Sequence, residues 1–432
     1  MSTLGLLSAL MKREFRRLAS RRIYWFILIL APAFCFIFFA DLLKQGLPMK
    51  LPIAVVDEDN TSLSRQLVRS LDAMAQTEVV MRTASFKEAR EAMQTSRIYG
   101  IFHIPANFRQ EVSVGKRPEI SFYTNETYLL PGSLVYKNMR LQAALANGAV
   151  QQTVLLAKGG GGPLLKARLS PITVDTFPLN NPWISYAIYL ASILMPAFVF
   201  MFAMFTATYS ISQETKEKTA ADWLRRSNDS IVLALLGKLL PQTLIFVTTG
   251  LLYLSILYGY LHFPLNSGFF PMFLAMLLLV LAAQGFAIFV TGIARRNRIA
   301  LSFCGLWGVL SFSVSGFTFP VPAMPQLMQL MSDLFPMRHY YLLYVDQALN
   351  GIPMAYSWKP YLALVLFVLL PLLTLPEIGF TGKSLFTLMG GYDERYLFYI
   401  SERVLPGFSG PCSTYFLYFS VFRLSPDLYF YL

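Results

Sequence analysis

The sequence predicts an α-helical membrane protein with six transmembrane helices and a mixed α/β extracytoplasmic domain inserted between the first two. Of its 432 residues, 55% are apolar and only 14% are charged, which is outside the range of soluble globular domains. Apolar runs long enough to cross a bilayer recur along the chain. Between the first two runs lies a polar stretch, residues 44–185, that is too long to be a loop.

Residues 1–22 predict a cytoplasmic amphipathic helix on the membrane surface. Apolar residues recur there at three- and four-residue steps, and the other side carries Lys12, Arg13, Arg16 and Arg17. Basic residues directly before the apolar run 23–43 favour a cytoplasmic N-terminus and a first transmembrane helix that leads outward. The run lacks a small-residue cleavage site, so we expect it to remain as an anchor.

The polar stretch 44–185 alternates strand-like and helical patterns, which predicts a folded α/β domain outside the membrane. Strands are expected over residues 51–56, 78–82, 97–104, 119–123 and 172–177, and helices over residues 62–74, 86–95 and 134–156. A glycine run at residues 159–162, followed by Pro163, predicts a mobile hinge before the last strand.

Residues 186–376 are expected to supply the other five transmembrane helices. The apolar runs cover residues 187–209, 239–261, 269–293, 299–318 and 358–375. Proline-rich backbone at residues 319–345 predicts a re-entrant or interfacial hairpin on the outer side, because such backbone needs protein or water around it. This plan places both termini in the cytoplasm and the chain in the cell inner, or plasma, membrane.

The loop 210–238 concentrates charges of both signs between two apolar runs. Glu214 and Lys218 form a favourable i,i+4 pair, and Arg225 falls on the same helical face, which predicts a short surface helix ending near Ser227. Such a helix could dock a partner protein. An ordinary solvated loop explains the same residues equally well.

Several other functions are disfavoured by the sequence. The net charge of +12 comes from dispersed basic residues or residues beside apolar runs, which argues against nucleic-acid binding. The closest match to a phosphate-binding loop, residues 379–384, has the wrong glycine spacing, so ATP hydrolysis on this chain is not expected. The predicted spans contain almost no ionisable residues, whereas proton- or sodium-coupled carriers need them.

No catalytic or metal site is predicted. His103, His262 and His339 are isolated in the sequence, and the three cysteines are too widely spaced to indicate a disulfide framework or a zinc site. The acidic run 57–59 could bind calcium, but a strand-to-helix turn with Asn60 or Thr61 as the helix cap explains it without a metal.

The chain resembles the permease subunits of ABC-2 type (type V) transporters over roughly residues 1–375. The resemblance rests on the strand 51–57 followed by Asn60 and Thr61, the loop 214–227, the segments 319–325 and 335–341, and the six-span plan. It implies an exporter in which two permease halves, identical or related, form the translocation path and a separate ABC subunit binds ATP and magnesium. No cofactor is then expected on this chain itself.

The resemblance also implies roles for particular residues. Coupling to the ATP-binding subunit falls on Glu214, Lys216, Glu217, Lys218, Trp223, Arg225, Arg295, Arg296 and Arg298. The outer gate hairpin contains Phe319, Pro320, Pro325, Arg338 and His339. The outer domain would guide or gate cargo, and a periplasmic adaptor could also dock on it.

Residues 377–432 depart from the family, whose members usually end soon after the sixth span. This aromatic-rich tail is open to three interpretations: a lineage-specific extension, a misread frame, or a segment that packs on the bundle. A membrane-anchored ligand-binding or sensor protein is the alternative to a permease, although the short loops and the tail offer no recognisable output domain.

Overall fold

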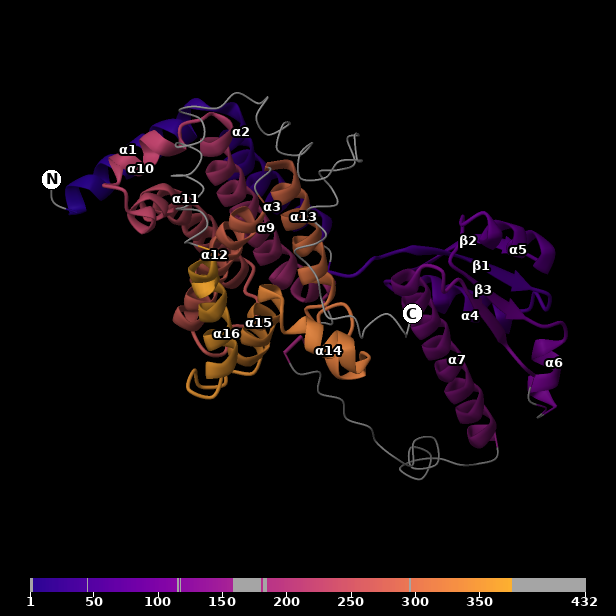
Figure 1. Cartoon of the computed structure of the whole chain (residues 1–432). Helices are drawn as coiled ribbons and strands as arrows, with labels where there is room; N and C mark the ends of the chain where they lie inside the picture. Colours follow the sequence, from indigo (N-terminus) through magenta and orange to yellow (C-terminus); the bar gives the residue numbers. More distant parts are fainter. Residues whose placement is uncertain are drawn as a thin grey trace, which may run out of the picture.

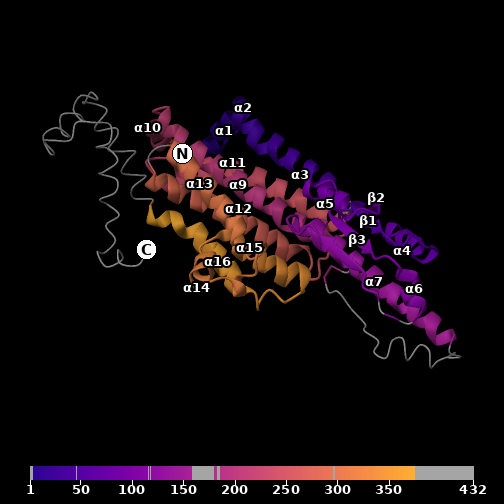
Figure 2. The same cartoon turned by 90° about the vertical axis from the view of Figure 1, so that its right-hand side faces the viewer.

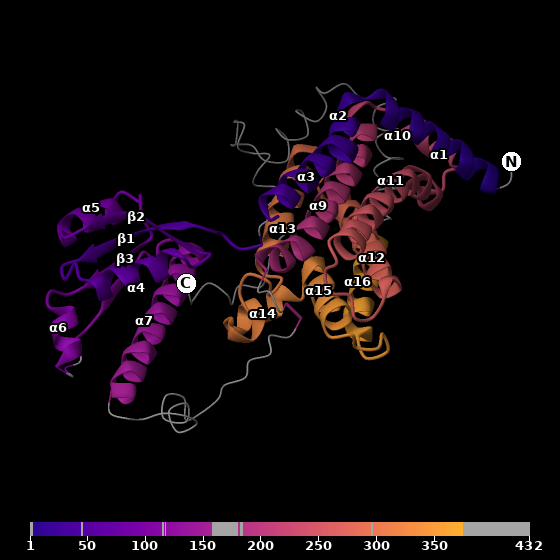
Figure 3. The same cartoon turned by 180° about the vertical axis from the view of Figure 1, so that it is seen from behind.

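The computed structural model describes residues 3–44, 46–114, 116, 118–157, 180–181, 185–294 and 297–374. They form a helical bundle and a smaller sheet domain, residues 51–157, which Figure 1 shows side by side. The N-terminal helix lies at the end of the bundle away from the sheet domain, as Figures 2 and 3 show from two further directions. The predicted hinge at 159–162, the strand 172–177 and the tail 377–432 lie outside the described residues.

Within these described ranges, four helical segments are long and apolar enough to cross a membrane: Arg22–Leu42, Tyr186–Lys216, Ile231–Tyr260 and Phe269–Ile293. The first segment comprises α2 (Arg22–Trp25), the π-helical η1 (Phe26–Leu30) and α3 (Ala31–Leu42). The second is α9 and the fourth is α12. The third joins α11 (Ile231–Leu254) to the π-helical η2 (Ser255–Tyr260). The predicted fifth and sixth spans are shorter helices, α13 (Asn297–Ser313) and the segment Trp358–Leu373, which joins α16 (Trp358–Leu369) to η5 (Leu370–Leu373).

Helix α12 is the centre of the bundle. It packs against α9, α11 and α16, and more of its apolar stretch is buried than in the other three long helices. Small residues allow the close approach: a Cβ at Gly285 would lie 2.5 Å from the carbonyl oxygen of Phe367 on α16. Association of apolar helices through small residues is typical of proteins in a bilayer.

The predicted outer hairpin is built from short helices. They are η3 (Val321–Ala323), α14 (Gln326–Ser332) and α15 (Pro336–Leu343), and η4 (Tyr344–Leu349) continues α15. Helix α15 packs against α12, α13 and α16, and its Met337, Tyr340 and Leu343 are fully buried. The second half of the hairpin is therefore part of the bundle core.

The sheet domain has a mixed four-stranded sheet in the order β2-β1-β3-β4. The strands β1 (Leu51–Asp57), β2 (Thr77–Thr83) and β3 (Gly100–Ile104) are parallel, and β4 (Ser121–Thr124) is antiparallel to β3. The helices are α4 (Ser62–Asp72), α5 (Phe86–Gln94), α6 (Phe108–Ser113) and α7 (Leu129–Ala157).

Successive side chains of β1 enter two different apolar cores, because neighbouring strand residues point to opposite faces. Ile53 and Val55 pack with residues of α4 and α7, whereas Ala54 and Val56 pack with α5. The strands expected within the described residues are confirmed, as are the three helices. Helix α6 was not predicted. Thr61 caps α4 in a capping box with Ser64, as the turn interpretation of residues 57–61 expected.

Candidate functional site

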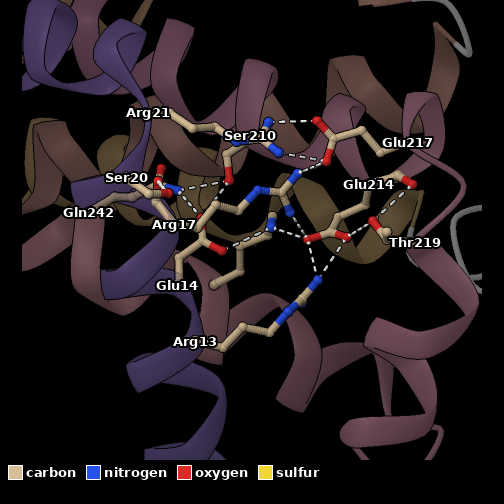
Figure 4. Close-up of polar contacts among 11 residues, drawn as sticks. Arg13, Glu14, Arg17, Ser20, Arg21, Ser210, Glu214, Glu217, Thr219 and Gln242 are labelled. Carbon is tan, nitrogen blue, oxygen red and sulfur yellow. Dashed lines mark hydrogen bonds and ion pairs between the residues drawn. The ribbon is translucent and has the colours of Figure 1, made fainter.

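A cluster of seven charged residues lies at the end of the bundle where α1 (Thr3–Ser20) crosses α9 and α11 (Figure 4). We call it the charge cluster; its members are Arg13, Glu14, Arg17, Arg21, Glu214, Glu217 and Lys238. The residues come from segments about 200 positions apart in the sequence. The cluster therefore joins the N-terminal surface helix to two membrane-crossing helices.

Helix α1 contacts the bundle through one side of the helix. Leu10, Glu14 and Leu18 recur at four-residue spacing, which places them on one side of a helix, and all three are buried. Gly237 of α11 allows the contact, because a Cβ there would lie 2.5 Å from the Cβ of Leu10. The sequence had suggested that the apolar face of α1 lies on the membrane; Leu4 and Phe15 do remain exposed, but the face with Glu14 packs on α11.

The centre of the charge cluster is fully buried. The Lys238 ammonium donates hydrogen bonds to Glu14 Oε2 at 3.1 Å and to Glu214 Oε1 at 2.7 Å, and the three residues are 1%, 2% and 0% exposed. Buried charges are tolerated when they are paired and hydrogen-bonded. Lys238 Nζ also lies 5.2 Å from the ring centroid of Trp223 on α10 (Ala220–Arg226), a favourable cation–π distance.

Polar side chains complete the inner part of the cluster. Ser210 donates to Glu14 Oε1 at 3.0 Å, and the Gln242 amide donates to the Ser210 hydroxyl at 2.9 Å. Thr219 donates to Glu214, so the loop after α9 is bound to the same carboxylate. Helices α1, α9 and α11 and the start of the loop thus share one hydrogen-bond network.

Arginines of α1 form the outer part of the cluster. Arg13 Nη2 lies 3.1 Å from Glu214 Oε2, and Arg17 contacts both Glu214 and Glu217. Arg21 binds Glu217 with both guanidinium nitrogens, at 2.6 and 2.8 Å. Hydrogen bonds from Arg21 lower the pKa of Glu217, and the same bonds raise the pKa of Arg21. The network thus extends from a buried core to the solvent.

The predicted surface helix over 214–227 is wrong in two respects. Helix α9 continues to Lys216, and Lys218 follows it with a φ of 59°, so Glu214 and Lys218 do not share a helix. The Glu214 side chain is buried in the charge cluster instead of facing solvent. The second helix, α10, begins at Ala220 and is a separate element.

The other predicted coupling residues divide into buried and exposed groups. Trp223 is buried with its ring facing the Lys238 ammonium, whereas Lys216, Glu217, Lys218 and Arg225 are exposed around α10. Arg298 is exposed in the first turn of α13. Arg295 and Arg296 lie outside the described residues. Glu217 also belongs to the charge cluster, and Lys216 and Lys218 flank it in the sequence, so the exposed group adjoins the outer part of the cluster.

The predicted outer gate residues are not a single site. Phe319, Pro320 and Pro325 are exposed, while His339 is buried with a ring nitrogen 2.9 Å from the Asp333 carbonyl oxygen. Arg338 donates to the Ser315 carbonyl oxygen at 3.1 Å. Backbone carbonyl oxygens thus contact Arg338 and His339, the two polar side chains among the predicted gate residues.

Glu14 and Lys238 were missed as functional candidates. Each has a signal in the sequence: Glu14 interrupts the face of Leu10 and Leu18, and Lys238 stands inside the apolar run of α11. A charged residue within an apolar helix predicts an internal partner. No group of three or more His, Cys, Asp or Glu side chains within the described ranges could hold a metal ion.

A bundle of long apolar helices, joined at one end to an amphipathic helix by buried ion pairs, defines a multi-pass membrane protein. The chain belongs to the ABC-2 family of transporter proteins, whose family model matches residues 22–375. The resemblance to ABC-2 permeases is thereby confirmed.

Relatives of this chain are permease components of ABC transporters. The linearmycin resistance permease protein LnrN of Bacillus subtilis is 24% identical over 73% of this chain and 83% of its own length. The probable multidrug ABC transporter permease YbhR of Escherichia coli is 22% identical over 67% and 75%, and the inner membrane transport permease YhhJ of E. coli is 23% identical over 73% and 81%. These relatives favour transport over the sensor alternative.

Proposed function

We propose that this chain is the membrane-spanning permease subunit of an ATP-driven exporter. It forms the translocation path with a second permease half, identical or related, and a separate ABC subunit binds ATP and magnesium. The observation that carries the proposal is the charge cluster, which binds α1 to α9 and α11 and includes Glu217, one of the exposed residues around α10. The names of LnrN and YbhR support a small-molecule cargo.

The charge cluster would transmit motion from the ATP-binding subunit to the bundle. A subunit that closes on ATP and pushes on α10 acts on Trp223, which packs against Lys238. Lys238 in turn holds Glu14 of α1 and Glu214 of α9. The three helices would therefore shift together and rock the two permease halves, which opens the path between α9 and α13 of each half.

The proposed topology has six spans, with both termini and α10 in the cytoplasm and the sheet domain outside the inner membrane. Its support is the gathering of basic residues at the charge-cluster end of the bundle, as cytoplasmic ends require. In a cysteine-free variant, a membrane-impermeant maleimide applied to whole cells should label Ala84→Cys, which is exposed in the sheet domain, and spare Lys218→Cys. Labelling of Lys218→Cys but not of Ala84→Cys would show that the chain has the opposite orientation in the membrane.

The coupling role can be tested on the exposed surface without disturbing the buried core. The double variant Lys216→Glu/Lys218→Glu reverses two exposed charges beside α10. It should abolish stimulation of the partner's ATPase activity and transport in reconstituted vesicles. Lys87→Glu, an equal change on the exposed face of α5 in the sheet domain, is the matched control and should leave both intact. Wild-type activity of the double variant would exclude this surface as the coupling site.

A further inference from the structure

A cavity of about 560 Å³ lies at the opposite end of the bundle, where the sheet domain joins it. Its walls come from α3, α9 and η2, and the connection that leads from α3 to β1 covers it. Apolar side chains dominate these walls, among them Phe36, Phe39, Leu43, Ile188, Ala191 and Leu257. The volume is in the range of small-molecule sites, roughly 300–1,000 Å³.

The connections to the sheet domain hold the cavity in place. Gly46 has a φ of 73°, and a Cβ there would lie 3.0 Å from the Ser185 hydroxyl. The amide of Tyr186 donates to the Gly46 carbonyl oxygen at 2.9 Å. The outgoing and returning segments are therefore joined beside the cavity. One wall is the π-helix η2, and π-helical turns are frequent at functional sites.

The polar residues at the cavity favour an anion. Lys44 and His262 line it and are exposed to solvent, and Gln76 and Ser185 add neutral hydrogen-bond donors. Among the described residues that line the cavity, none is Asp or Glu. An apolar chamber beside the Lys44 ammonium and the His262 imidazole fits a molecule with a hydrocarbon chain and a negatively charged head group.

The cavity is also placed where a membrane lipid can reach it. Its three helical walls belong to segments that are long and apolar enough to cross the bilayer. The neighbouring side of α3 exposes Phe34, Ile37 and Phe38, as a lipid-facing surface does. Lys44 stands just past the end of α3, which is the level of lipid head groups.

We propose that the cavity binds an anionic phospholipid, with one acyl chain between α3, α9 and η2 and the phosphate against Lys44 and His262. The bound chain would contact the connection to the sheet domain, so lipid occupancy would support the joint between the two parts. The site lies at the other end of the bundle from the charge cluster. Its occupancy can be measured without the ATP-binding subunit and without cargo, so the test stands apart from the exporter proposal.

The test uses the full chain in nanodiscs that contain phosphatidylglycerol with a photoactivatable diazirine at the end of one acyl chain. After irradiation, mass spectrometry should place cross-links on the cavity-lining parts of α3, α9 and η2. Ala187→Phe should remove them by filling the cavity, since Ala187 lines it and is only partly buried. Lys44→Gln/His262→Gln should weaken cross-linking about fivefold, the effect expected for loss of the Lys44 charge near the lipid head group.

Controls make each outcome decisive. Lys50→Gln removes an exposed lysine from the same connection but outside the cavity lining, and it should cross-link as the wild type does. A phosphatidylcholine probe of the same length should label the cavity much less than phosphatidylglycerol. Equal labelling by both lipids would overturn the assignment of an anionic ligand. Cross-links spread over the exposed side of α3 and unchanged in Ala187→Phe would overturn the site itself. Lys44→Gln/His262→Gln alters exposed side chains, so its result does not depend on refolding of the core.

Discussion

Removal of Lys238 tests the energetics of the charge cluster. Lys238→Met keeps an unbranched side chain of similar length but removes the ammonium group. Glu14 is then left without a cation, because among the described residues Lys238 is the one that pairs with it. Breaking a buried ion pair from one side costs about 3–5 kcal/mol, since the remaining charge stays buried and unpaired. Ser210 and Gln242 still donate to Glu14, which favours the lower part of that range.

The double variant Lys238→Met/Glu14→Gln distinguishes a charge effect from a packing effect. It removes the unpaired carboxylate, and Glu214 keeps Arg13, Arg17 and Thr219 as partners. Replacement of both partners of a buried pair often leaves the free energy of unfolding nearly unchanged. The double variant should therefore regain most of the stability that Lys238→Met loses. The assay is the unfolding midpoint of the purified chain in detergent.

Lys216→Met is the matched control for Lys238→Met, because Lys216 is exposed at the end of α9, and its midpoint should match that of the wild type. A wild-type unfolding midpoint for Lys238→Met would refute the reasoning. A midpoint of Lys238→Met/Glu14→Gln that is no higher than that of Lys238→Met would refute it as well.

Two further predictions concern the contact of α1 with the rest of the bundle. Gly237→Val places a side chain against Leu10 and should release α1 from α11. Limited proteolysis would detect this release as faster cleavage near the N-terminus. Gly259→Val is the control and should not speed cleavage, because no atom lies within 4 Å of the Cβ position at Gly259. Arg21 holds the pKa of Glu217 below its ordinary value of 4.5, so this pair stabilises the fold above pH 4.5 and loses that effect as the pH falls through the lower folded-state pKa. Wild type and Arg21→Gln should therefore differ in unfolding midpoint at neutral pH and converge on acidification, and a constant difference would contradict the assignment.

Local patterns in the sequence were sufficient for much of the fold. The apolar run of residues 51–56 is typical of one strand buried on both faces, and the Thr61 cap depends on residues within one turn. The apolar runs of α9, α11 and α12 likewise follow from the length needed to cross a bilayer. Each of these features is determined by neighbours in the sequence.

The charge cluster was only partly predictable, because its contacts are tertiary. Glu214 was singled out, but its orientation depends on Arg13 and Arg17, which lie about 200 residues earlier. These arginines form ion pairs with Glu214 in the last turn of α9, which extends past the apolar run to Lys216. Local spacing alone instead predicts an i,i+4 pair between Glu214 and Lys218. The sequence alone does not show that α1 packs across the bundle end.

The most direct measurement of the proposed function is the composition of the native complex. The tagged chain is purified from its own membrane in mild detergent, and its stoichiometric partners are identified by mass spectrometry. A soluble subunit with a phosphate-binding loop should be present with the wild type and absent with Lys216→Glu/Lys218→Glu. A folded, intact chain that brings down no such subunit would contradict the account of a permease driven by a separate ATPase.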